Sequence, residues 1–419
     1  MVSLWMVSLM APMRVAVIGG GAAGFFGAIA AASSNTEVTI FEAGRQVLSK
    51  VRISGGGRCN VTHACFEPSQ LIQNYPRGGK ALRGPLTRFQ PRDTVSWYRQ
   101  RGVKLKTESD GRMFPVTDDS ETIVDCLTQT ARKAGVRIRT GTPVVGVDLQ
   151  KTVGFAINLK SGESVPCDRL LLASGSSPQG YRMAKRLGHS IVPPVPSLFT
   201  FTIRDPRLEG LAGVSVPDVS LKLTTPDKTK LDQSGPLLVT HWGLSGPAVL
   251  KLSAWGARSL YDSRYSATLS INWIPHLKED SVRQTLATLR ETSAKRTITT
   301  RPEFQLPKRL WQSLVTAAEI PPTQRWADLS KKALNKLLQE LVRGQFQIVA
   351  KGQFKDEFVT CGGVELKQVN FKTMESRCCE GLHFAGEVLD IDGVTGGFNF
   401  QSAWTTSWIA GTAIANSLS

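Results

Sequence analysis

The stretch that most constrains the fold runs from Arg14 to Gly24 and reads RVAVIGGGAAG. Its apolar start is typical of a buried parallel strand, and the glycines that follow have the spacing G-x-G-x-x-G at the beginning of a helical segment over 22–32. Such glycines permit a tight turn, leave room for a pyrophosphate and let the helix lie close to the strand. The stretch predicts a dinucleotide-binding unit whose phosphate contacts are Gly19, Gly21, Ala22, Ala23 and Gly24.

A second strand over 38–41 ends in Glu42. The spacing from the glycine turn is about twenty residues, the distance at which a carboxylate meets a ribose hydroxyl in this kind of unit. We therefore expect Glu42 to bind the ribose.

A second glycine-rich segment, Ser54-Gly55-Gly56-Gly57-Arg58, follows soon afterwards. Three consecutive glycines let the backbone approach a ligand closely, so this segment is predicted to line the pyrophosphate or the flavin edge, with Lys50 or Arg58 neutralising charge. A flexible glycine loop without a ligand is the alternative.

The βαβ signals up to residue 175 predict a doubly wound α/β sheet. Strands are expected over 136–138 and 144–147, followed by a hairpin strand over 155–159 and a buried strand over 170–175. The last of them ends in Ala173, Ser174 and Gly175, small residues that let a sheet edge touch a nucleotide. We assign these three residues, and Val145 in an earlier strand, to the cofactor.

The pattern changes near residue 193. Period-two alternation over 199–203, 219–223 and 267–273 predicts an antiparallel sheet or small barrel, and helices are expected over 280–290, 307–318 and 328–343. The segment 240–248 is predicted to be a loop that starts a helix at Pro247. Nucleotide-binding features return after residue 380. The predicted domains are an FAD-binding domain (13–192 and 354–419), an inserted β-barrel-like domain (193–275 and 345–353) and a helical subdomain (276–344).

One glycine turn and a sheet completed by the C-terminus suit FAD better than NAD. Glu387, after Gly386, is expected to accept hydrogen bonds from the ribityl hydroxyls. The helix that begins near Phe398 would direct its positive end at the N1 and O2 edge of the ring, which favours an anionic reduced flavin. Without a second glycine turn, NAD(P)H would dock only transiently. The predicted contacts in this segment are Gly386, Glu387, Gly396, Gly397, Phe398 and Asn399.

Four segments, 53–62, 111–115, 240–247 and 385–399, together resemble the BaiN/RdsA-type (YhiN-like) family of NAD(P)/FAD-dependent oxidoreductases. The resemblance runs from Met13 to the end of the chain. It implies a two-part Rossmann-like FAD domain interrupted by a β-barrel-like domain and a helical cap, with flavin contacts in the segments already named. Activities named in that family include reduction of activated C=C bonds and oxidation of amines. The chain departs from the family pattern at 173–176 and at His63, where asparagine is common.

We expect flavin N5 to carry hydride to or from a small organic substrate while the protein orients and shields the ring. The candidate proton donors are Cys59, Asn60, His241 and Asn399. Each also has a structural alternative: packing for Cys59, backbone capping for Asn60 and Asn399, and an ordinary loop position for His241.

Three other functions remain open. A dithiol flavoenzyme would use Cys59 and Cys65, although their C-x5-C spacing and the preceding glycines argue against it. The basic surface is compatible with an RNA-modifying flavoenzyme. A flavin-dependent binding or regulatory protein without turnover is the third.

Composition limits the classes of molecule that this protein is expected to bind. The formal charge of +17 would attract phosphates and nucleic acid, but no nucleic-acid motif is recognisable, so we expect the charge to serve solubility and nucleic acid not to be a partner. The seven scattered cysteines and the lack of zinc spacing predict a reducing cytoplasm and no metal. No apolar run is long enough for a membrane span. The apolar first twelve residues suggest an early or misassigned start codon. The oligomeric state cannot be inferred from these patterns.

Overall fold

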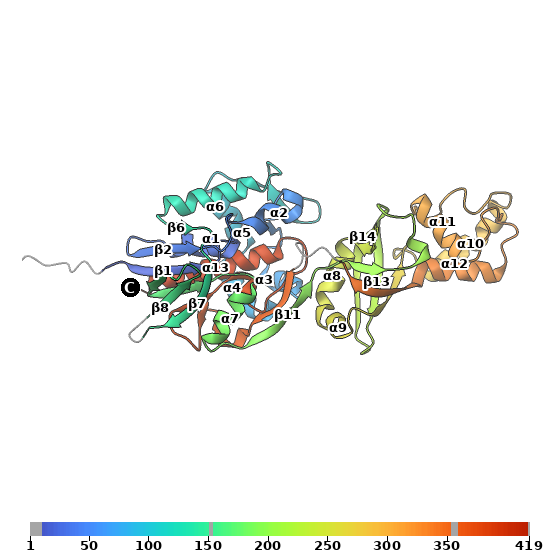
Figure 1. The fold of residues 1–419 in the computed structure, drawn as a ribbon. Helices are drawn as coiled ribbons and strands as arrows, with labels where there is room; N and C mark the ends of the chain where they lie inside the picture. The colour runs from blue at the N-terminus through green and yellow to red at the C-terminus, as the bar shows by residue number, and fades with distance from the viewer. Residues whose placement is uncertain (1–10, 151–153, 353–358, 418–419) are drawn as a thin grey trace, which may run out of the picture. The chain divides into compact units, whose positions relative to one another are not determined.

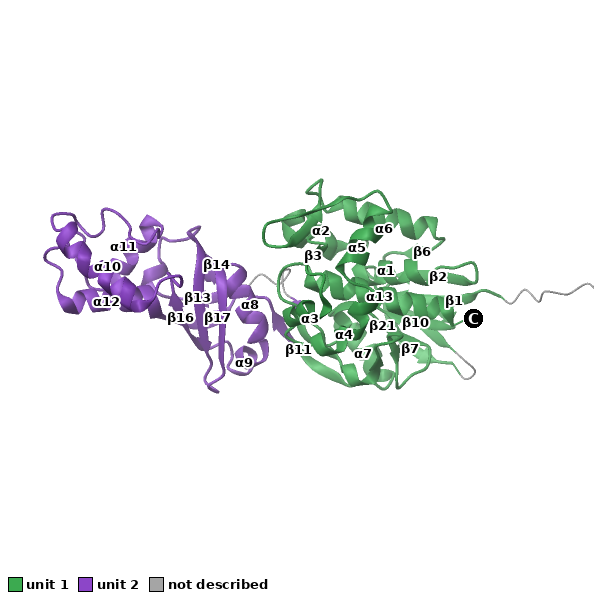
Figure 2. Cartoon of the chain, turned by 180° about the vertical axis from the view of Figure 1, so that it is seen from behind, with its two compact units in different colours: residues 1–194, 360–419 green, residues 195–359 purple. Residues whose placement is uncertain are grey.

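The computed structural model describes residues 11–150, 154–352 and 359–417. The chain divides into two compact units, residues 1–194 with 360–419 and residues 195–359 (Figure 2). The expected start codon concerns residues mostly outside the described part of the chain, and the predicted boundary between 353 and 354 also lies outside it. Each unit is described by itself.

The first unit is built on a seven-stranded sheet in the order β19-β20-β21-β10-β1-β2-β6 (Figure 1). The five strands from β21 to β6 are parallel, and the two that follow β21 at the other edge are antiparallel. Its strands are β1 (Met13–Ile18), β2 (Thr36–Phe41), β6 (Arg137–Arg139), β10 (Arg169–Leu172), β19 (Val369–Asn370), β20 (Glu375–Ser376) and β21 (Leu382–Phe384). The chain order reverses between β1 and β10, and ligands bind parallel sheets at such a switch point.

Helices from both ends of the chain pack together in this unit. The first, α1 (Ala22–Ala31), lies so close to the last, α13 (Phe398–Asn416), that a Cβ on Gly411 would be 2.3 Å from the Gly27 oxygen. The C-terminal helix therefore packs directly against the helix that follows the first glycine turn. The other helices are α2 (Ser49–Gly57), α3 (Pro68–Leu71), α4 (Gly79–Arg88), α5 (Pro91–Arg99), α6 (Glu121–Lys133) and α7 (Pro178–Arg186).

Three small sheets complete the description outside the large sheet and the barrel. One contains β3 (Thr62–His63), β4 (Leu105–Thr107) and β5 (Arg112–Pro115), and another contains β7 (Val144–Leu149), β8 (Phe155–Leu159) and β9 (Ser164–Cys167). Strands β11 (Ile191–Ser197) and β18 (Val359–Val364) form a two-stranded sheet.

The second unit contains a closed antiparallel barrel in the order β12-β15-β14-β13-β16-β17. Buried residues alternate along β16 and β17, as the period-two pattern requires. The barrel strands are β12 (Phe201–Ile203), β13 (Ser215–Thr224), β14 (Lys230–Thr240), β15 (Gly243–Ser245), β16 (Ala267–Asn272) and β17 (Gly344–Lys351).

Among the described residues, five helices accompany the barrel, and one hydrophobic core joins the barrel to all of them. Trp273 and Phe346 on the barrel side belong to the same buried cluster as Trp311 and Leu337 on the helices. The helices are α8 (Pro247–Trp255), α9 (Ala257–Asp262), α10 (Glu279–Thr292), α11 (Lys308–Ala317) and α12 (Lys331–Arg343).

The predicted fold class is confirmed: a Rossmann-like α/β domain is interrupted by an insertion that contains a barrel and helices. Two local predictions were wrong. The strand over 144–147 does not join the doubly wound sheet, because β7 pairs antiparallel with β8 in a separate sheet. The segment 240–248 does start a helix at Pro247, but it is not simply a loop, because Gly243–Ser245 pairs with both β12 and β14. Gly243 has φ +145°, and a Cβ there would lie 2.3 Å from the Phe201 oxygen, so the strand depends on glycine at this position.

Membrane spans and metal sites are both absent from residues 11–150, 154–352 and 359–417. No helix there is long and apolar enough to cross a membrane, and no group of His, Cys, Asp or Glu there has the arrangement of a metal site. All seven cysteines are free thiols. The cytoplasmic location stays a prediction.

Burial of His383 in β21 predicts a loss of stability in acid. The side chain is 3% exposed, and burial lowers its pKa to about 4 from an ordinary value of 6.5. Below pH 6.5 the unfolded chain binds a proton that the folded chain does not bind until about pH 4. Stability is therefore present above pH 6.5 and falls through this window, by about 3 kcal/mol for one such group. Urea denaturation from pH 7 to 4 should show a flatter profile for His383→Gln. Exposed His276→Gln should keep the wild-type slope.

Candidate flavin-binding site

The glycine turn lies where the ends of β1 and β10 diverge. Gly19 has φ +111°, and a Cβ there would be 2.4 Å from the Ala173 oxygen at the end of β10. A Cβ on Gly24 would be 1.8 Å from the Gly19 oxygen, whereas one on Gly21 would meet nothing within 4 Å. The turn and α1 therefore contact the sheet through Gly19 and Gly24, while Gly21 leaves open space at a helix start that no side chain caps.

Glu42 follows β2 directly and turns back to the same glycine turn. Its two carboxylate oxygens accept hydrogen bonds from the backbone N–H groups of Gly20 at 2.7 Å and Gly44 at 2.6 Å. These bonds fix the carboxylate beside the turn. The predicted ribose contact remains a proposal, and a carboxylate that accepts two such bonds retains lone pairs for a further donor.

The second glycine segment forms an irregular end to α2. Ser54 is extended, and Gly55, Gly56 and Gly57 have φ values of +59°, +70° and +84°. No atom lies within 4 Å of the Cβ positions of Gly56 and Gly57, whereas a Cβ on Gly55 would be 3.0 Å from the Phe114 ring. Two successive peptide units are therefore open on one side, as the close approach of a ligand requires.

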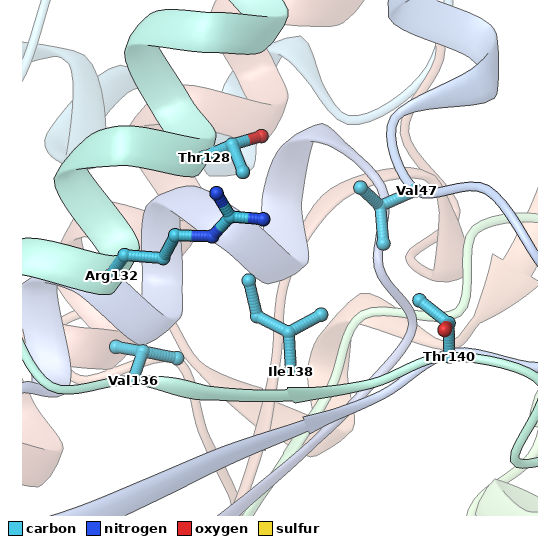
Figure 3. A pocket seen from close by; sticks show the side chains of 6 residues that line it. All are labelled: Val47, Thr128, Arg132, Val136, Ile138 and Thr140. Carbon is cyan, nitrogen blue, oxygen red and sulfur yellow. The ribbon is translucent and has the colours of Figure 1, made fainter.

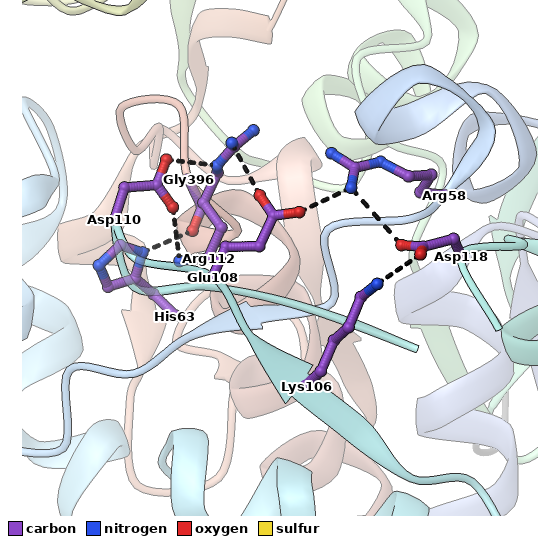
Figure 4. A network of polar contacts seen from close by, with 8 residues as sticks. All are labelled: Arg58, His63, Lys106, Glu108, Asp110, Arg112, Asp118 and Gly396. Carbon is purple, nitrogen blue, oxygen red and sulfur yellow. Dashed lines mark hydrogen bonds and ion pairs between the residues drawn. The ribbon is translucent and has the colours of Figure 1, made fainter. Parts of the chain in front are cut away.

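Arg58 is directed to carboxylates of the protein. Figure 4 shows its guanidinium bonded to Glu108 at 2.7 Å, with Asp118 at 3.5 Å. The guanidinium also lies 4.0 Å from the centroid of the Phe114 ring. The hydrogen bond to Glu108 raises the pKa of Arg58, and one from Lys106 lowers the pKa of Asp118. This network holds the glycine segment against β5, a role that the sequence analysis did not assign to Arg58.

Lys50 and Glu387, which are 337 positions apart in the sequence, form an ion pair at 2.7 Å. The other Glu387 oxygen accepts from the Thr360 N–H at 3.0 Å. A Cβ on Gly386 would be 2.7 Å from the Ala23 side chain. The Gly386–Val388 segment (η5) thus adjoins both α1 and α2, which are the elements that carry the two glycine segments.

Two buried hydroxyl groups near the end of β10 lack hydrogen-bond partners. They are Ser174 Oγ and the Tyr181 hydroxyl, both among the described residues. Burial raises the pKa of Tyr181, and the charges of Glu387 and Asp390 raise it further. Because buried hydroxyls are rarely left unpaired, a polar ligand at this position would satisfy them.

Val145 lies at a bulge in β7, where the register with β8 shifts between Val144 and Gly146. Its backbone oxygen accepts a hydrogen bond from Gln179 on α7. The next residue, Gly180, approaches Ser174 so closely that a Cβ would be 1.9 Å from Ser174 Oγ. Val145 is thereby linked to the same end of β10 as the other predicted contacts.

A residue from a distant part of the chain fixes the turn that precedes α13. Gly397 has φ +92°, and the Asn60 amide, in the orientation that satisfies both of its groups, accepts from the Gly397 N–H and donates to the Thr62 oxygen, each at 3.0 Å. Asn399 bonds to the backbone N–H and oxygen of Gly393 at 2.8 and 2.9 Å. No side chain caps the helix, so its first N–H groups remain available to an anion.

His63 supports the same turn and was missed as a site residue. Its Nδ1 lies 2.9 Å from the Gly396 oxygen, and its ring stacks on Phe398 with centroids 4.6 Å apart. A Cβ on Gly111 would be 2.5 Å from His63 Nε2. In the sequence, the sign of this contact is the segment 111–115, because its Gly111 leaves room for the His63 ring.

The structure brings three of the four candidate proton donors into the first unit. Asn60 and Asn399 both use their amides on backbone groups, and Cys59 is fully buried with a pKa raised by burial to about 12. His241 belongs to the second unit and is exposed at the turn between β14 and β15, beside Trp242, which is 62% exposed. The structure does not group His241 with the other three in one unit.

Burial makes Cys59 an unreactive thiol, and this yields a prediction against the dithiol alternative. Iodoacetamide at pH 8 should label exposed Cys378 while Cys59 stays unmodified, because a thiol with a pKa of about 12 is almost wholly protonated there. Peptide mapping by mass spectrometry measures both sites. Labelling of Cys59 at the rate of Cys378, or a disulfide between Cys59 and Cys65, would support the dithiol enzyme.

These features fit a dinucleotide. The Cβ positions of Gly21, Gly56 and Gly57 each face open space, and the starts of α1 and α13 have no side-chain cap on their N–H groups. The two unpartnered hydroxyls belong to the same region. That these predicted contacts enclose one cofactor stays a proposal, with Lys50, Glu42 and Glu387 as its charged groups.

A separate pocket lies on the outer side of β6 and is not this region. Figure 3 shows Arg132 and Thr128 of α6 pointing into it opposite Ile138. Val47, Val136 and Thr140 complete its lining. None of the predicted site residues contributes to this pocket.

Comparison with curated proteins finds relatives that match almost the whole chain. The chain is 32% identical over 408 residues to the "Ribosomal RNA dihydrouridine synthase" of Escherichia coli, covering 94% of this chain and 95% of the relative. It is 29% identical over 421 residues to the "3-dehydro-bile acid delta(4,6)-reductase" of Clostridium scindens, covering 96% and 99%. A second protein with the dihydrouridine synthase name, from Haemophilus influenzae, is 30% identical over 413 residues, covering 95% and 98%.

Solved structures with this fold include two steroid dehydrogenases. The 3-ketosteroid-delta4-(5alpha)-dehydrogenase of Rhodococcus jostii has a TM-score of 0.50 at 16% identity, and 98% of each chain is covered. The 3-ketosteroid delta1-dehydrogenase of Sterolibacterium denitrificans has a TM-score of 0.52 at 10% identity, with 97% of this chain and 100% of the other covered. These likenesses describe the fold alone.

The family model described as "HI0933-like protein Rossmann domain" matches residues 13–413. This match and the relatives above confirm the resemblance read from the four sequence segments. The chain belongs to the HI0933-like family of Rossmann-type flavoprotein oxidoreductases.

Proposed function

We propose that this protein is an NAD(P)H-dependent flavoenzyme that reduces a carbon–carbon double bond conjugated to a carbonyl group, and that its substrate is a uracil ring in RNA. The observation that carries the flavin chemistry is the α13 N-terminus, whose N–H groups are uncapped beside the glycine segment. When bound, FAD supplies a hydride from N5 of its ring system.

The residues of the chain bind and orient that group. Gly19 to Gly24 would hold the pyrophosphate on backbone N–H groups, and Glu42 would hold the ribose. Lys50, which is 61% exposed in its side chain, is free to exchange Glu387 for a phosphate oxygen, while Glu387 would accept from the ribityl hydroxyls. The α13 N-terminus favours negative charge at the N1 and O2 edge of the flavin.

His241, in the second unit, stays a proton-donor candidate that rests on the sequence segment 240–247 alone. Asn60 and Asn399 are occupied with backbone groups, and Cys59 holds its proton too tightly at neutral pH.

The choice of substrate is supported by relatives and by charge. Dihydrouridine formation and a delta(4,6)-reduction both saturate a double bond conjugated to a carbonyl, and these are the reactions that the names of the curated relatives describe. The net charge of +17 and a pI near 9.8 suit a polyanionic substrate better than a neutral steroid. This proposal departs from the expectation that nucleic acid is not a partner.

Anaerobic half-reactions test the function. NADH and NADPH are added separately to the FAD-loaded protein, and the reduced protein is then mixed with unmodified ribosomal RNA transcripts, a steroid dienone or oxygen. Loss of the flavin absorbance with a nicotinamide, its return with RNA, and dihydrouridine detected by nucleoside mass spectrometry are expected. His241→Gln should be reduced by the nicotinamide normally but reoxidised by RNA about a hundredfold more slowly. Reoxidation by oxygen alone contradicts the proposed reaction, and reoxidation by the dienone without dihydrouridine contradicts the RNA substrate.

A further inference from the structure

The positive charge of the second unit is confined to its helical part. Residues 281–351 contain thirteen Lys or Arg and five Asp or Glu, whereas residues 195–280 contain nine and eight. Helices α10 to α12 and their connections therefore carry the excess, and the preceding part of the barrel is nearly neutral. Because both parts share one hydrophobic core, the charge is presented by a folded surface.

Many of these cations have no carboxylate partner. Arg283 and Arg343 both pair with Glu279, Arg296 pairs with Glu303, and Lys336 pairs with Glu319. Other exposed cations in this part of the described chain make no ion pair, and these are Lys295, Arg301, Lys308, Arg309, Arg325, Lys331 and Lys332. Unpaired surface cations retain their full attraction for an external anion.

The fold gathers four of them into one region. The segments 294–298 and 324–327 run antiparallel, with hydrogen bonds from Trp326 N–H to the Arg296 oxygen and from Ala327 N–H to the Ala294 oxygen. This pairing places Lys295 and Arg325 on neighbouring antiparallel segments of the chain. Helix α12 begins a few residues later with Lys331 and Lys332, after Ser330 Oγ accepts from the Ala333 N–H. We call Lys295, Arg325, Lys331 and Lys332 the basic cluster.

Buried anchors keep the basic cluster in place. Trp326 is fully buried and Leu329 is 1% exposed, and they lie between the two pairs of cations in the sequence. The cluster is thus a built surface near the start of α12, where the helix dipole adds to the positive potential. Figure 1 shows α10, α11 and α12 side by side in the second unit.

We propose that the basic cluster is the docking surface for the phosphate backbone of the RNA substrate, an inference that rests on the proposed function. Lysine and arginine side chains without protein partners neutralise phosphates and release condensed counterions, which supplies much of the affinity for a nucleic acid. Such contacts position the RNA and carry no sequence information.

A lipid surface is the main alternative for a basic patch, and the exposed apolar residues argue against it. Membrane-binding surfaces combine cations with large apolar side chains that enter the lipid. The large apolar side chains that are exposed in the described residues include Trp242, Trp255 and Val349, but none within 281–348. The cluster therefore has the charge of a polyanion site without the apolar face of a membrane anchor.

Charge reversal tests the surface. Binding of FAD-loaded protein to in vitro transcribed ribosomal RNA is measured over a range of salt concentrations for K331E/K332E and K295E/R325E. Each double variant should weaken binding by on the order of tenfold or more at moderate salt and lower the slope of log K against log salt by about two. The matched control is K228E/K230E, two exposed lysines of the β13–β14 hairpin that should leave both values unchanged. Reduction of the flavin by nicotinamide should stay at the wild-type rate in all variants.

The outcomes separate this inference from the proposed function. If the cluster variants lose salt-dependent RNA binding but even the wild type forms no dihydrouridine, the docking surface is supported and the uracil reaction is contradicted. If the cluster variants still form dihydrouridine and bind RNA with wild-type affinity, the docking surface is contradicted and the reaction is supported. Binding of anionic phosphatidylserine vesicles without any RNA binding overturns the inference in favour of a membrane, and an equal effect of K228E/K230E shows only a general charge effect and also overturns it.

Discussion

Gly24→Ala is expected to leave the protein without FAD and strongly destabilised. A methyl group there would stand 1.8 Å from the Gly19 oxygen and 3.0 Å from its carbonyl carbon, and both contacts are with backbone that cannot rotate away. Either α1 must move off the sheet or the turn must open. We expect a loss of more than about 3 kcal/mol in unfolding free energy, measured by urea denaturation, and purified protein with little yellow colour.

Gly21→Ala separates folding from cofactor binding. Nothing lies within 4 Å of the Cβ position, and the residue has φ −89°, which alanine adopts without strain. The apo protein should therefore keep its stability within about 0.5 kcal/mol. The methyl group would occupy the space assigned to the pyrophosphate, so the affinity for FAD, measured by calorimetric titration, should fall at least tenfold.

The pair of variants makes the assignment testable in two independent ways. A stable Gly24→Ala protein with a full complement of FAD would show that the third glycine is not needed for close packing of the helix. A Gly21→Ala protein that binds FAD as tightly as wild type would show that the phosphates do not lie against the second glycine. The first result concerns the fold, and the second concerns the site.

The glycine turns were predictable because their chemistry is local. Gly19 and Gly24 need their residue type for contacts made within the same strand, turn and helix, or with the adjacent strand end at Ala173. Glu42 is similar, since its position follows from the length of one βαβ unit. Periodicity likewise predicted the barrel strands β12, β13 and β16, because one face of each is buried.

Contacts between distant residues could not be predicted from spacing. Lys50 meets Glu387 across 337 positions, and Asn60 meets the backbone at Gly397, because the C-terminal helix packs against the first one. Arg58 was expected to neutralise charge on the cofactor, and its bond to Glu108 depends on the pairing of β4 with β5. The bulge at Val145 also could not be predicted from the sequence, since one extra residue leaves the alternation of buried and exposed positions nearly unchanged.

The second large effect is expected at Arg77, whose guanidinium pairs with Asp392. The Asp392 side chain has no exposed surface and that of Arg77 is 18% exposed, with Nε bonded to Oδ1 at 2.5 Å. Asp392 precedes Gly393, the residue that Asn399 holds from the first turn of α13, so the pair anchors the loop next to the flavin region. Arg77→Met leaves a buried carboxylate without its countercharge, which costs about 3–5 kcal/mol in unfolding free energy.

A matched surface pair and a double variant decide whether burial is the cause of that loss. Arg139 and Glu163 form an ion pair of similar length at 2.7 Å, but their side chains are 37% and 48% exposed, so Arg139→Met should cost less than about 1 kcal/mol. Arg77→Met combined with Asp392→Asn removes both charges and should recover part of the stability that Arg77→Met loses, giving a clear coupling energy in urea denaturation. If Arg77→Met costs no more than Arg139→Met, the buried pair does not stabilise this loop. If the double variant is as unstable as the sum of its parts, the loss comes from the packing of the Arg77 stem, because an unpaired charge would have been relieved.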